Sequence, residues 1–151
     1  IRLDYDAQYI IHYSSPAAQN SGSLNSAFGN LDSIQQLVDA FPAKVAKVQR
    51  HWRDFIERKR KVGKKIVLWG GGSKAVAFVT TLGLNDELAS IVDINPFKQG
   101  KFLPGSGHQV TAPKDLKKIM PDVVIVMNPI YVPEIRKSLN ELGLAPEVVA
   151  V

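Results

Sequence analysis

The spacing of hydrophobic and polar positions changes twice along the chain and divides it into three parts. Residues 1–13 alternate apolar or aromatic residues with others, which is typical of an extended strand. Residues 14–30 are rich in Ser, Asn, Gly and Ala and indicate a loop or linker. We therefore expect an N-terminal strand and linker at 1–30, an amphipathic basic helix or helix pair at 31–63, and a separate domain at 64–151.

The middle part carries a helical pattern. Between Ile34 and Ile56 apolar residues recur every three or four positions and form one continuous stripe. Asn30 fits an N-cap and Gly63 fits the end of the helix. Pro42 interrupts the pattern, so we expect either a kink or two abutting helices. The stripe is expected to pack on the sheet or on a neighbouring domain.

From Lys65 the pattern alternates between short apolar runs and helical segments. Strands are expected at Ile66–Trp69, Ser90–Asp93, Val123–Met127 and Val148–Val151, with a short extended piece at Val110, and helices at Ser73–Leu82, Pro113–Ile119 and Val132–Leu142. Strands that alternate with helices favour right-handed crossovers and a parallel sheet. The predicted fold class is α/β, a Rossmann-like parallel sheet flanked by helices and preceded by a long N-terminal helical segment.

The first strand of this domain runs into a glycine-rich turn. Gly70, Gly72 and Ala75 fit the spacing G-x-G-x-x-A, and Asp93 ends the next strand 18 residues beyond Ala75. Such a turn brings backbone close to a ligand, and the N-terminus of the following helix attracts anions. This pattern is typical of a phosphate-binding βαβ unit with a carboxylate for a ribose hydroxyl. The alternative is a turn whose glycines serve close packing of helix on strand.

Ligands of parallel sheets bind outside the carboxyl ends of the strands, where several polar residues of this chain gather. Lys74 and Lys98 are candidates for a phosphate, Asp93 or Asn95 for a sugar hydroxyl, and Asn128 for a base or carbonyl group. The candidate substrate- or nucleotide-binding residues are Gly70, Gly72, Ser73, Lys74, Asp93, Asn95, Lys98, Gln99, His108, Asn128 and Tyr131.

Two of these candidates have ordinary structural alternatives. His108 stands in a loop, where it serves either as an acid or base or as a partner for backbone groups. Tyr131 lies at a helix start, where it either contacts a ligand or packs.

The composition excludes several kinds of site. The chain has no cysteine and three scattered histidines, so no metal site is expected. It shows no paired-carboxylate site, no Ser-His-Asp spacing and no P-loop, and its catalytic residues remain unassigned. No apolar run approaches the ~20 residues of a membrane helix, and no signal peptide is visible. We expect a cytoplasmic protein and, since residue 1 is Ile1, a piece of a longer polypeptide.

The positive charge is concentrated in one segment. Of the residues 44–65, ten are Lys or Arg, against the two carboxylates Asp54 and Glu57. Such a block binds nucleic acid or a protein partner in some proteins. Aromatic residues for base stacking are not interleaved with the basic ones. The pattern therefore favours a solvated helix face over nucleic-acid binding.

Three strings resemble the C-terminal domain of SAM-dependent sugar C-methyltransferases: LWGGGSKAVAF, VDINPFKQGKFLPGSGH and PDVVIVMNPIYVPEI. That family typically shows W/Y-G-A-G-x-K-G, then D-x-N-P-x-K-Q-G-x-x-x-P-G-T, then P-D-x-x-x-x-x-N-P-x-Y. The motifs fall in order and spacing over about residues 60–151. Departures are Gly71 in place of Ala, Ala75 in place of Gly, and Ser106 in place of Thr.

The resemblance implies a role within a larger enzyme. In such enzymes a zinc-binding portion and a SAM-binding methyltransferase domain precede this domain, and a methyl group passes to a carbon of a nucleotide-linked keto-sugar. The C-terminal domain is then expected to hold the nucleotide-sugar, with no cofactor of its own. Its partners are the substrate and the upstream methyltransferase domain, and the fragment is inactive by itself. The alternative is a free-standing NAD(P)- or nucleotide-binding module.

Overall fold

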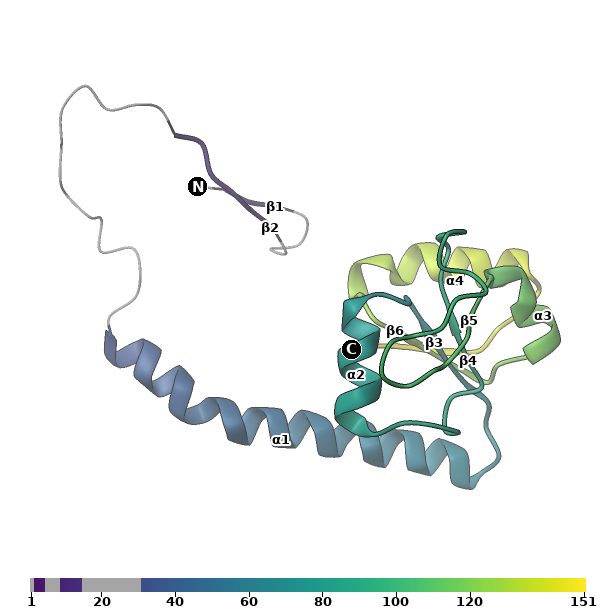
Figure 1. The fold of residues 1–151 in the computed structure, drawn as a ribbon, viewed down its shortest axis with the longest axis horizontal. Helices are drawn as coiled ribbons and strands as arrows, with labels where there is room; N and C mark the ends of the chain where they lie inside the picture. Colours follow the sequence, from purple (N-terminus) through teal and green to yellow (C-terminus); the bar gives the residue numbers. More distant parts are fainter. Residues whose placement is uncertain (1, 5–8, 15–30) are drawn as a thin grey trace. The chain divides into compact units, whose positions relative to one another are not determined.

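A computed structural model describes residues 2–4, 9–14 and 31–151, whose contacts divide into two units, Ile1–Lys44 and Val45–Val151 (Figure 1). The N-terminal unit contains strands β1 (Arg2–Asp4) and β2 (Tyr9–Ile11), which pair antiparallel. Two short strands thus stand where the alternation predicted one. Pairing gives each strand partners for backbone groups that a single strand leaves unpaired. The predicted linker and the predicted cap Asn30 lie outside the described residues, apart from Ser14.

Helix α1 runs from Leu31 to Lys61 as one element and includes Pro42. Of the two alternatives for this proline, a pair of abutting helices is therefore wrong. A proline inside a helix removes one backbone hydrogen bond, which a helix of this length tolerates when its neighbouring turns remain bonded. The last turn carries four basic residues (58–61), which suit the negative end of the helix dipole.

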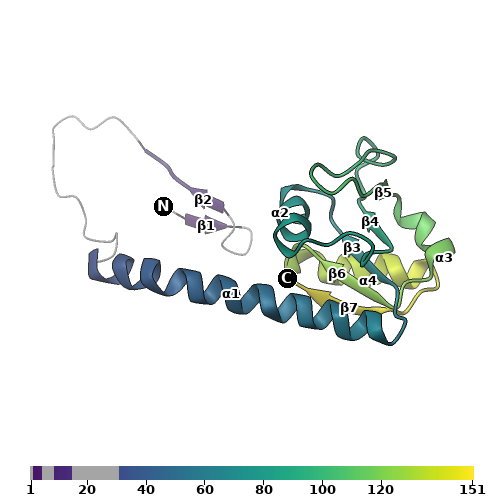
Figure 2. The ribbon, with the colours of Figure 1, turned by 60° about the horizontal axis from the view of Figure 1, so that its bottom comes forward.

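A five-stranded sheet forms the centre of the Val45–Val151 unit (Figure 2). Its strands are β3 (Ile66–Trp69), β4 (Ser90–Val92), β5 (Val110–Thr111), β6 (Val123–Val126) and β7 (Glu147–Ala150). All pairings are parallel, in the order β5-β4-β3-β6-β7. The predicted Rossmann-like fold class is confirmed, because the order reverses direction beside β3, as in doubly wound sheets.

The helices between the strands follow the predicted segments. They are α2 (Ser73–Leu82), the short 3₁₀ turn η1 (Pro113–Asp115), α3 (Leu116–Ile119) and α4 (Val132–Glu141). A further 3₁₀ turn, η2 (Pro129–Tyr131), precedes α4 and was not predicted. The segments that begin with proline start as 3₁₀ turns, which are frequent at helix N-termini, where the N–H that proline lacks would have no helical partner.

Each face of the sheet is covered by a separate core. Ile66 and Leu68 of β3 face a core that includes side chains of α1 and α2. Val67 and Trp69 face a second core with α3 and α4. Because both faces are covered, the strands read as continuous apolar runs. The result is a three-layer sandwich of helix, sheet and helix.

The second half of α1 is part of the first core. Trp52 and Ile56 are 7% and 1% exposed. The Trp52 ring meets the rings of Phe55 and Phe78 edge-on, with centroids 5.6 and 5.4 Å apart. At its surface, Lys59 pairs with Glu147 and Arg60 with Glu87. Part of the basic block therefore fastens the helix to the domain.

Asp122, which precedes β6, forms hydrogen bonds with residues that precede β3. Its Oδ1 accepts a hydrogen bond from Lys64 Nζ at 2.8 Å, and its Oδ2 accepts one from the backbone N–H of Lys65 at 2.9 Å. The Lys64 hydrogen bond, followed by that of Lys65, lowers the pKa of Asp122 below its ordinary value of 3.8. The carboxylate thus holds the entry to β3 beside the entry to β6.

No helix in the described part of the chain combines the length and apolar composition needed to cross a membrane. The same residues contain no group of three His, Asp or Glu side chains placed to hold a metal ion.

Replacing the Trp52 anchor tests the packing of α1 on the domain. We expect Trp52→Ala to lower the free energy of unfolding of the Val45–Val151 unit by about 3–5 kcal/mol, because the cavity would form in a closed core. Urea unfolding measured by circular dichroism checks this. Val62→Ala is the matched control, since Val62 is 69% exposed. If both changes lowered the free energy of unfolding equally, the buried packing of Trp52 would not be the cause.

The Asp122 contacts predict an acid-dependent stability. A lowered pKa in the folded state stabilises the protein above the unfolded value near 3.8, and this stabilisation is lost as the pH falls through the lower folded value. The stability difference between the parent chain and Asp122→Asn should therefore shrink as the pH falls below 3.8. Thermal unfolding across this range measures it. A difference that stays constant with pH would contradict the assignment.

Candidate functional site

The glycine turn between β3 and α2 is built by close backbone approach. Gly70 has a φ of +112°, and a Cβ there would lie 3.3 Å from Cβ of Met127. Gly72 is the N-cap of α2, in extended conformation, and no side chain caps the helix. The backbone N–H groups of the first turn of α2 have no intrahelical partner, and the positive end of the helix dipole lies with them. The turn therefore presents a site of positive potential.

Asp93, predicted for a sugar hydroxyl, is 7% exposed and already holds three donors. Its Oδ2 accepts hydrogen bonds from the N–H of Gly71 at 2.8 Å and from Lys98 Nζ at 3.0 Å. Its Oδ1 accepts one from the N–H of Asn95 at 2.8 Å. The carboxylate thus ties the glycine turn to the loop after β4. Its contact with a ligand stays a prediction.

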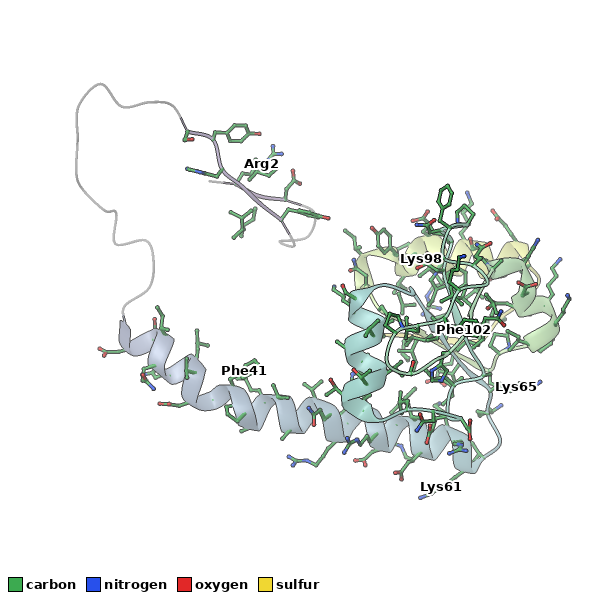
Figure 3. The ribbon with its side chains drawn as sticks, viewed as in Figure 1. Arg2, Phe41, Lys61, Lys65, Lys98 and Phe102 are labelled. Atoms are coloured by element: carbon green, nitrogen blue, oxygen red, sulfur yellow. The ribbon has the colours of Figure 1, made fainter. Side chains whose placement is uncertain are left out.

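Lys98 lies over the glycine turn (labelled in Figure 3). Besides its salt bridge to Asp93, its Nζ is 3.9 Å from the position that a Cβ of Gly72 would take. The Lys98 side chain is 42% exposed, so the ammonium reaches both the buried carboxylate and solvent. This ammonium and the first turn of α2 face the same space.

Three of the predicted residues shape the loops around that space. The N–H of Phe97 donates to Asn95 Oδ1 at 3.0 Å, and Gln99 Nε2 donates to the carbonyl of Asp93 at 3.0 Å. His108 contacts Ser106 Oγ at 2.9 Å and the carbonyl oxygen of Asn85 at 2.6 Å. Asn95, Gln99 and His108 do not line the cavity described next, and their contact with a ligand stays a prediction.

A cavity of about 480 Å³ opens at the carboxyl edge of the sheet. It lies where β3 and β6 end, at the point where the strand order reverses. Eight predicted residues line it: Gly70, Gly72, Ser73, Lys74, Asp93, Lys98, Asn128 and Tyr131. The structure thus brings these eight residues together around one cavity, and their contact with a ligand stays a prediction.

Seven further lining residues were not predicted. Glu134 and Ser138 of α4 line the cavity, together with the apolar residues Trp69, Ile94, Val126, Met127 and Ile135. Glu134 and Ser138 are four residues apart and share one helix face one turn beyond Tyr131. That spacing, beside a strand end already assigned to the site, was the signal available in the sequence.

The chemistry of the lining is mixed. Two lysine ammonium groups and a helix N-terminus attract an anion on one side. Hydroxyl, amide and carboxylate groups on the other side, from Tyr131, Asn128, Ser138 and Glu134, suit a polyhydroxylated group. The arrangement can bind and orient a polar, anionic molecule.

Asp93 joins the glycine turn to the loop after β4, and measuring the stability of a variant tests this structural role. We expect Asp93→Ala to lower the free energy of unfolding by about 1–3 kcal/mol, because the N–H of Gly71 would lose its partner. Urea unfolding measures the loss, with the exposed Asp86→Ala as control. Unchanged stability would contradict this structural role of Asp93.

Comparison with solved structures gives matches of low similarity, three of which are described here. UDP-D-quinovosamine 4-dehydrogenase from Vibrio fischeri is 20% identical, with a TM-score of 0.47, over 58% of this chain and 77% of that one. The Rex-family repressor RSP is 16% identical, with a TM-score of 0.41, over 58% and 52% of the two chains. The structure of RSP in complex with β-NADH is 16% identical, with a TM-score of 0.41, over 62% of this chain and 57% of that one.

Sequence comparison identifies the family. No curated protein matches the chain significantly. Residues 27–145, most of the chain, match the family described as C-methyltransferase C-terminal domain. The match includes the glycine turn, the Asp93–Gly105 segment and the Pro121–Tyr131 segment, from which the resemblance was inferred. The chain belongs to the C-methyltransferase C-terminal domain family.

Proposed function

We propose that this chain is the nucleotide-sugar-binding domain of a SAM-dependent C-methyltransferase that acts on a nucleotide-linked keto-sugar. The observation that carries the proposal is the cavity where β3 and β6 end, which combines an anion-attracting turn with a hydroxyl- and amide-lined wall. Membership of the family supplies the reaction to which such binding would belong.

The phosphate groups are assigned to the glycine turn. A diphosphate placed there would accept hydrogen bonds from the N–H groups at the start of α2 and would face Lys74 and Lys98. Lys74 is exposed and follows Ser73 in the first turn of the helix. Charge-assisted contacts of this kind are stronger than neutral ones because one partner is ionised.

The sugar is assigned to the wall formed by η2 and α4. Asn128, Tyr131, Glu134 and Ser138 offer donors and acceptors to hydroxyl and carbonyl groups. The volume of about 480 Å³ lies within the range of about 300–1,000 Å³ of small-molecule sites. Apolar side chains also line the cavity, and polar contacts are stronger in surroundings from which water is excluded.

Methyl transfer is assigned to other parts of the enzyme. We place the SAM site and a zinc-binding portion upstream, on the same cytoplasmic polypeptide, and assign this chain no cofactor of its own. The upstream methyltransferase domain is then its partner. Under this proposal the chain by itself binds the nucleotide-sugar without turning it over.

One contact argues against the alternative of an NAD(P)-binding module. In dinucleotide folds, a carboxylate at the end of the second strand binds the ribose hydroxyl. Here the corresponding Asp93 is 7% exposed and bonded to Gly71, Asn95 and Lys98. A ribose would have to displace the lysine from that carboxylate.

Replacing Lys74 tests the assignment of the phosphates. A charge-assisted contact contributes on the order of 1.5–3 kcal/mol, so Lys74→Ala should weaken binding of dTDP-glucose by roughly tenfold or more. Isothermal titration calorimetry measures the affinity. Lys114→Ala, an exposed lysine on η1, is the matched control and should leave it unchanged.

Two outcomes would contradict the assignment. If Lys74→Ala had no effect while Lys98→Ala abolished binding, the site would belong to the 93–101 loop and the glycine turn would serve packing. If neither change mattered, the cavity would not be the anion site.

The choice of ligand is tested in a separate comparison. We expect the parent chain to bind dTDP-glucose more tightly than NAD and to show no micromolar affinity for SAM. Calorimetry with the three ligands in the same buffer decides between them. Preferential binding of NAD would favour the free-standing dinucleotide module, and micromolar binding of SAM would favour a methyltransferase site within this chain.

A further inference from the structure

The loop after β4 presents an exposed aromatic residue at the rim of the cavity. Phe97 is 87% exposed, and Ile94, which lines the cavity, is 67% exposed. Lys98, the residue after Phe97, lines the cavity as well. Consecutive Cα atoms are about 3.8 Å apart, so Phe97, which does not line the cavity itself, stands at its rim. Exposed apolar residues scattered singly are ordinary, whereas these two belong to one turn beside a polar cavity.

Hydrogen bonds order the turn that carries Phe97. The N–H of Lys98 donates to the carbonyl oxygen of Asn95 at 3.0 Å, which closes the turn, and the N–H of Phe97 donates to Asn95 Oδ1 at 3.0 Å. Pro96 takes the second position of this turn, which suits its fixed φ. Because the backbone under Phe97 is already ordered, a ligand that contacts the ring causes little further loss of conformational entropy.

The strand order relates this turn to the two groups already assigned to the ligand. β4 and β6 lie on opposite sides of β3, so the loop after β4 and the turn η2 after β6 flank the glycine turn. On the β4 side, Lys98 Nζ is 3.9 Å from the position that a Cβ of Gly72 would take. A nucleotide-sugar carries its sugar on one phosphate and its nucleoside on the other. With the sugar at η2 and α4, the nucleoside leaves the glycine turn toward the loop after β4.

Exposure decides which apolar groups are open to contact with a base. Four of the apolar residues that line the cavity are only 1–6% exposed: Trp69, Val126, Met127 and Ile135. Ile94 and Phe97, in contrast, expose most of their surface. Tyr131 is 39% exposed, but it follows β6, on the side assigned to the sugar. An exposed aromatic ring binds a base by stacking, because every base has a π-face.

We propose that Phe97 and Ile94 form the subsite for the nucleobase, with the base stacked on the Phe97 ring and packed against Ile94. This inference rests on the proposed function and extends it, because it gives the nucleotide-sugar a direction, with the base on the β4 side and the sugar on the β6 side. Asp93 keeps its salt bridge to Lys98 in this arrangement. The nucleoside is thus held by stacking and not by a contact between ribose and carboxylate.

Two ligands that share a diphosphate group test the subsite: dTDP, which carries a base, and inorganic pyrophosphate, which does not. We expect Phe97→Ala to weaken binding of dTDP to the full 151-residue chain roughly tenfold, the size of one stacking contact. The same change should leave pyrophosphate binding unaltered, and Phe97→Tyr, which keeps an aromatic ring, should retain the affinity for dTDP. Isothermal titration calorimetry measures these affinities.

Phe102→Ala is the matched control. Phe102, labelled in Figure 3, belongs to the same loop and is 66% exposed, but it does not line the cavity. Its replacement removes the same ring from the surface and should change neither affinity. Circular dichroism confirms that the variants fold.

The outcomes separate this inference from the proposed function. If the parent chain binds both ligands and Phe97→Ala changes neither affinity, the base subsite is overturned while the phosphate assignment stands. If Phe97→Ala weakens both ligands equally, Phe97 supports the loop that carries Lys98, and stacking is overturned. If the parent chain binds neither ligand, the proposed function and the subsite both fail.

Nuclear Overhauser effects test the direction of the ligand. We expect cross-peaks between the base protons of bound dTDP and the ring protons of Phe97, assigned by their loss in Phe97→Ala. Cross-peaks from the base to the Tyr131 ring in their place would reverse the ligand in the cavity and overturn the subsite.

Discussion

The burial of β3 on both of its faces determines where every other part of the domain lies. This strand is bonded to β4 on one side and to β6 on the other, and its residues are 0–6% exposed. Ile66 and Leu68 are held under α1 and α2, while Val67 and Trp69 are held under α3 and α4. Because the strand cannot shift between these cores, its carboxyl end is fixed. The glycine turn begins at that end, and so does the cavity.

Close approach at the end of β3 then forms the site. Gly70 passes so near to Met127 that a side chain there would force Met127 to move. The next glycine donates to the buried Asp93, which also holds Lys98 above the turn. One carboxylate therefore positions both the free helix N-terminus and the ammonium that faces it. Packing, turn geometry and electrostatics all place positive potential at the strand ends.

The sequence predicted the elements whose signals are local. The apolar run at 66–69, the glycine turn after it and the proline that opens η1 each contain their own structural cause, and the structure has them where expected. The hydrogen-bond partners of individual side chains were less predictable. The hydrogen bonds of Asn95 and His108 to nearby loop groups follow from the folded loops, and their contact with a ligand stays a prediction. Likewise, only the folded loop brings Lys98 onto Asp93. The four-residue spacing of Glu134 and Ser138 puts them on one helix face, but only the fold brings that face to the glycine turn.

The central claim is that the cavity between the glycine turn and α4 binds a nucleotide-sugar. Titration of the ¹⁵N-labelled chain with dTDP-glucose, followed by amide chemical shifts, tests it most directly, because the amide groups themselves are the assigned phosphate ligands. The account predicts saturable shifts centred on the amides of Gly72, Ser73 and Lys74, with further shifts at Asn128 and Tyr131. Shifts confined to the basic segment of α1, or no saturable shifts, would contradict it.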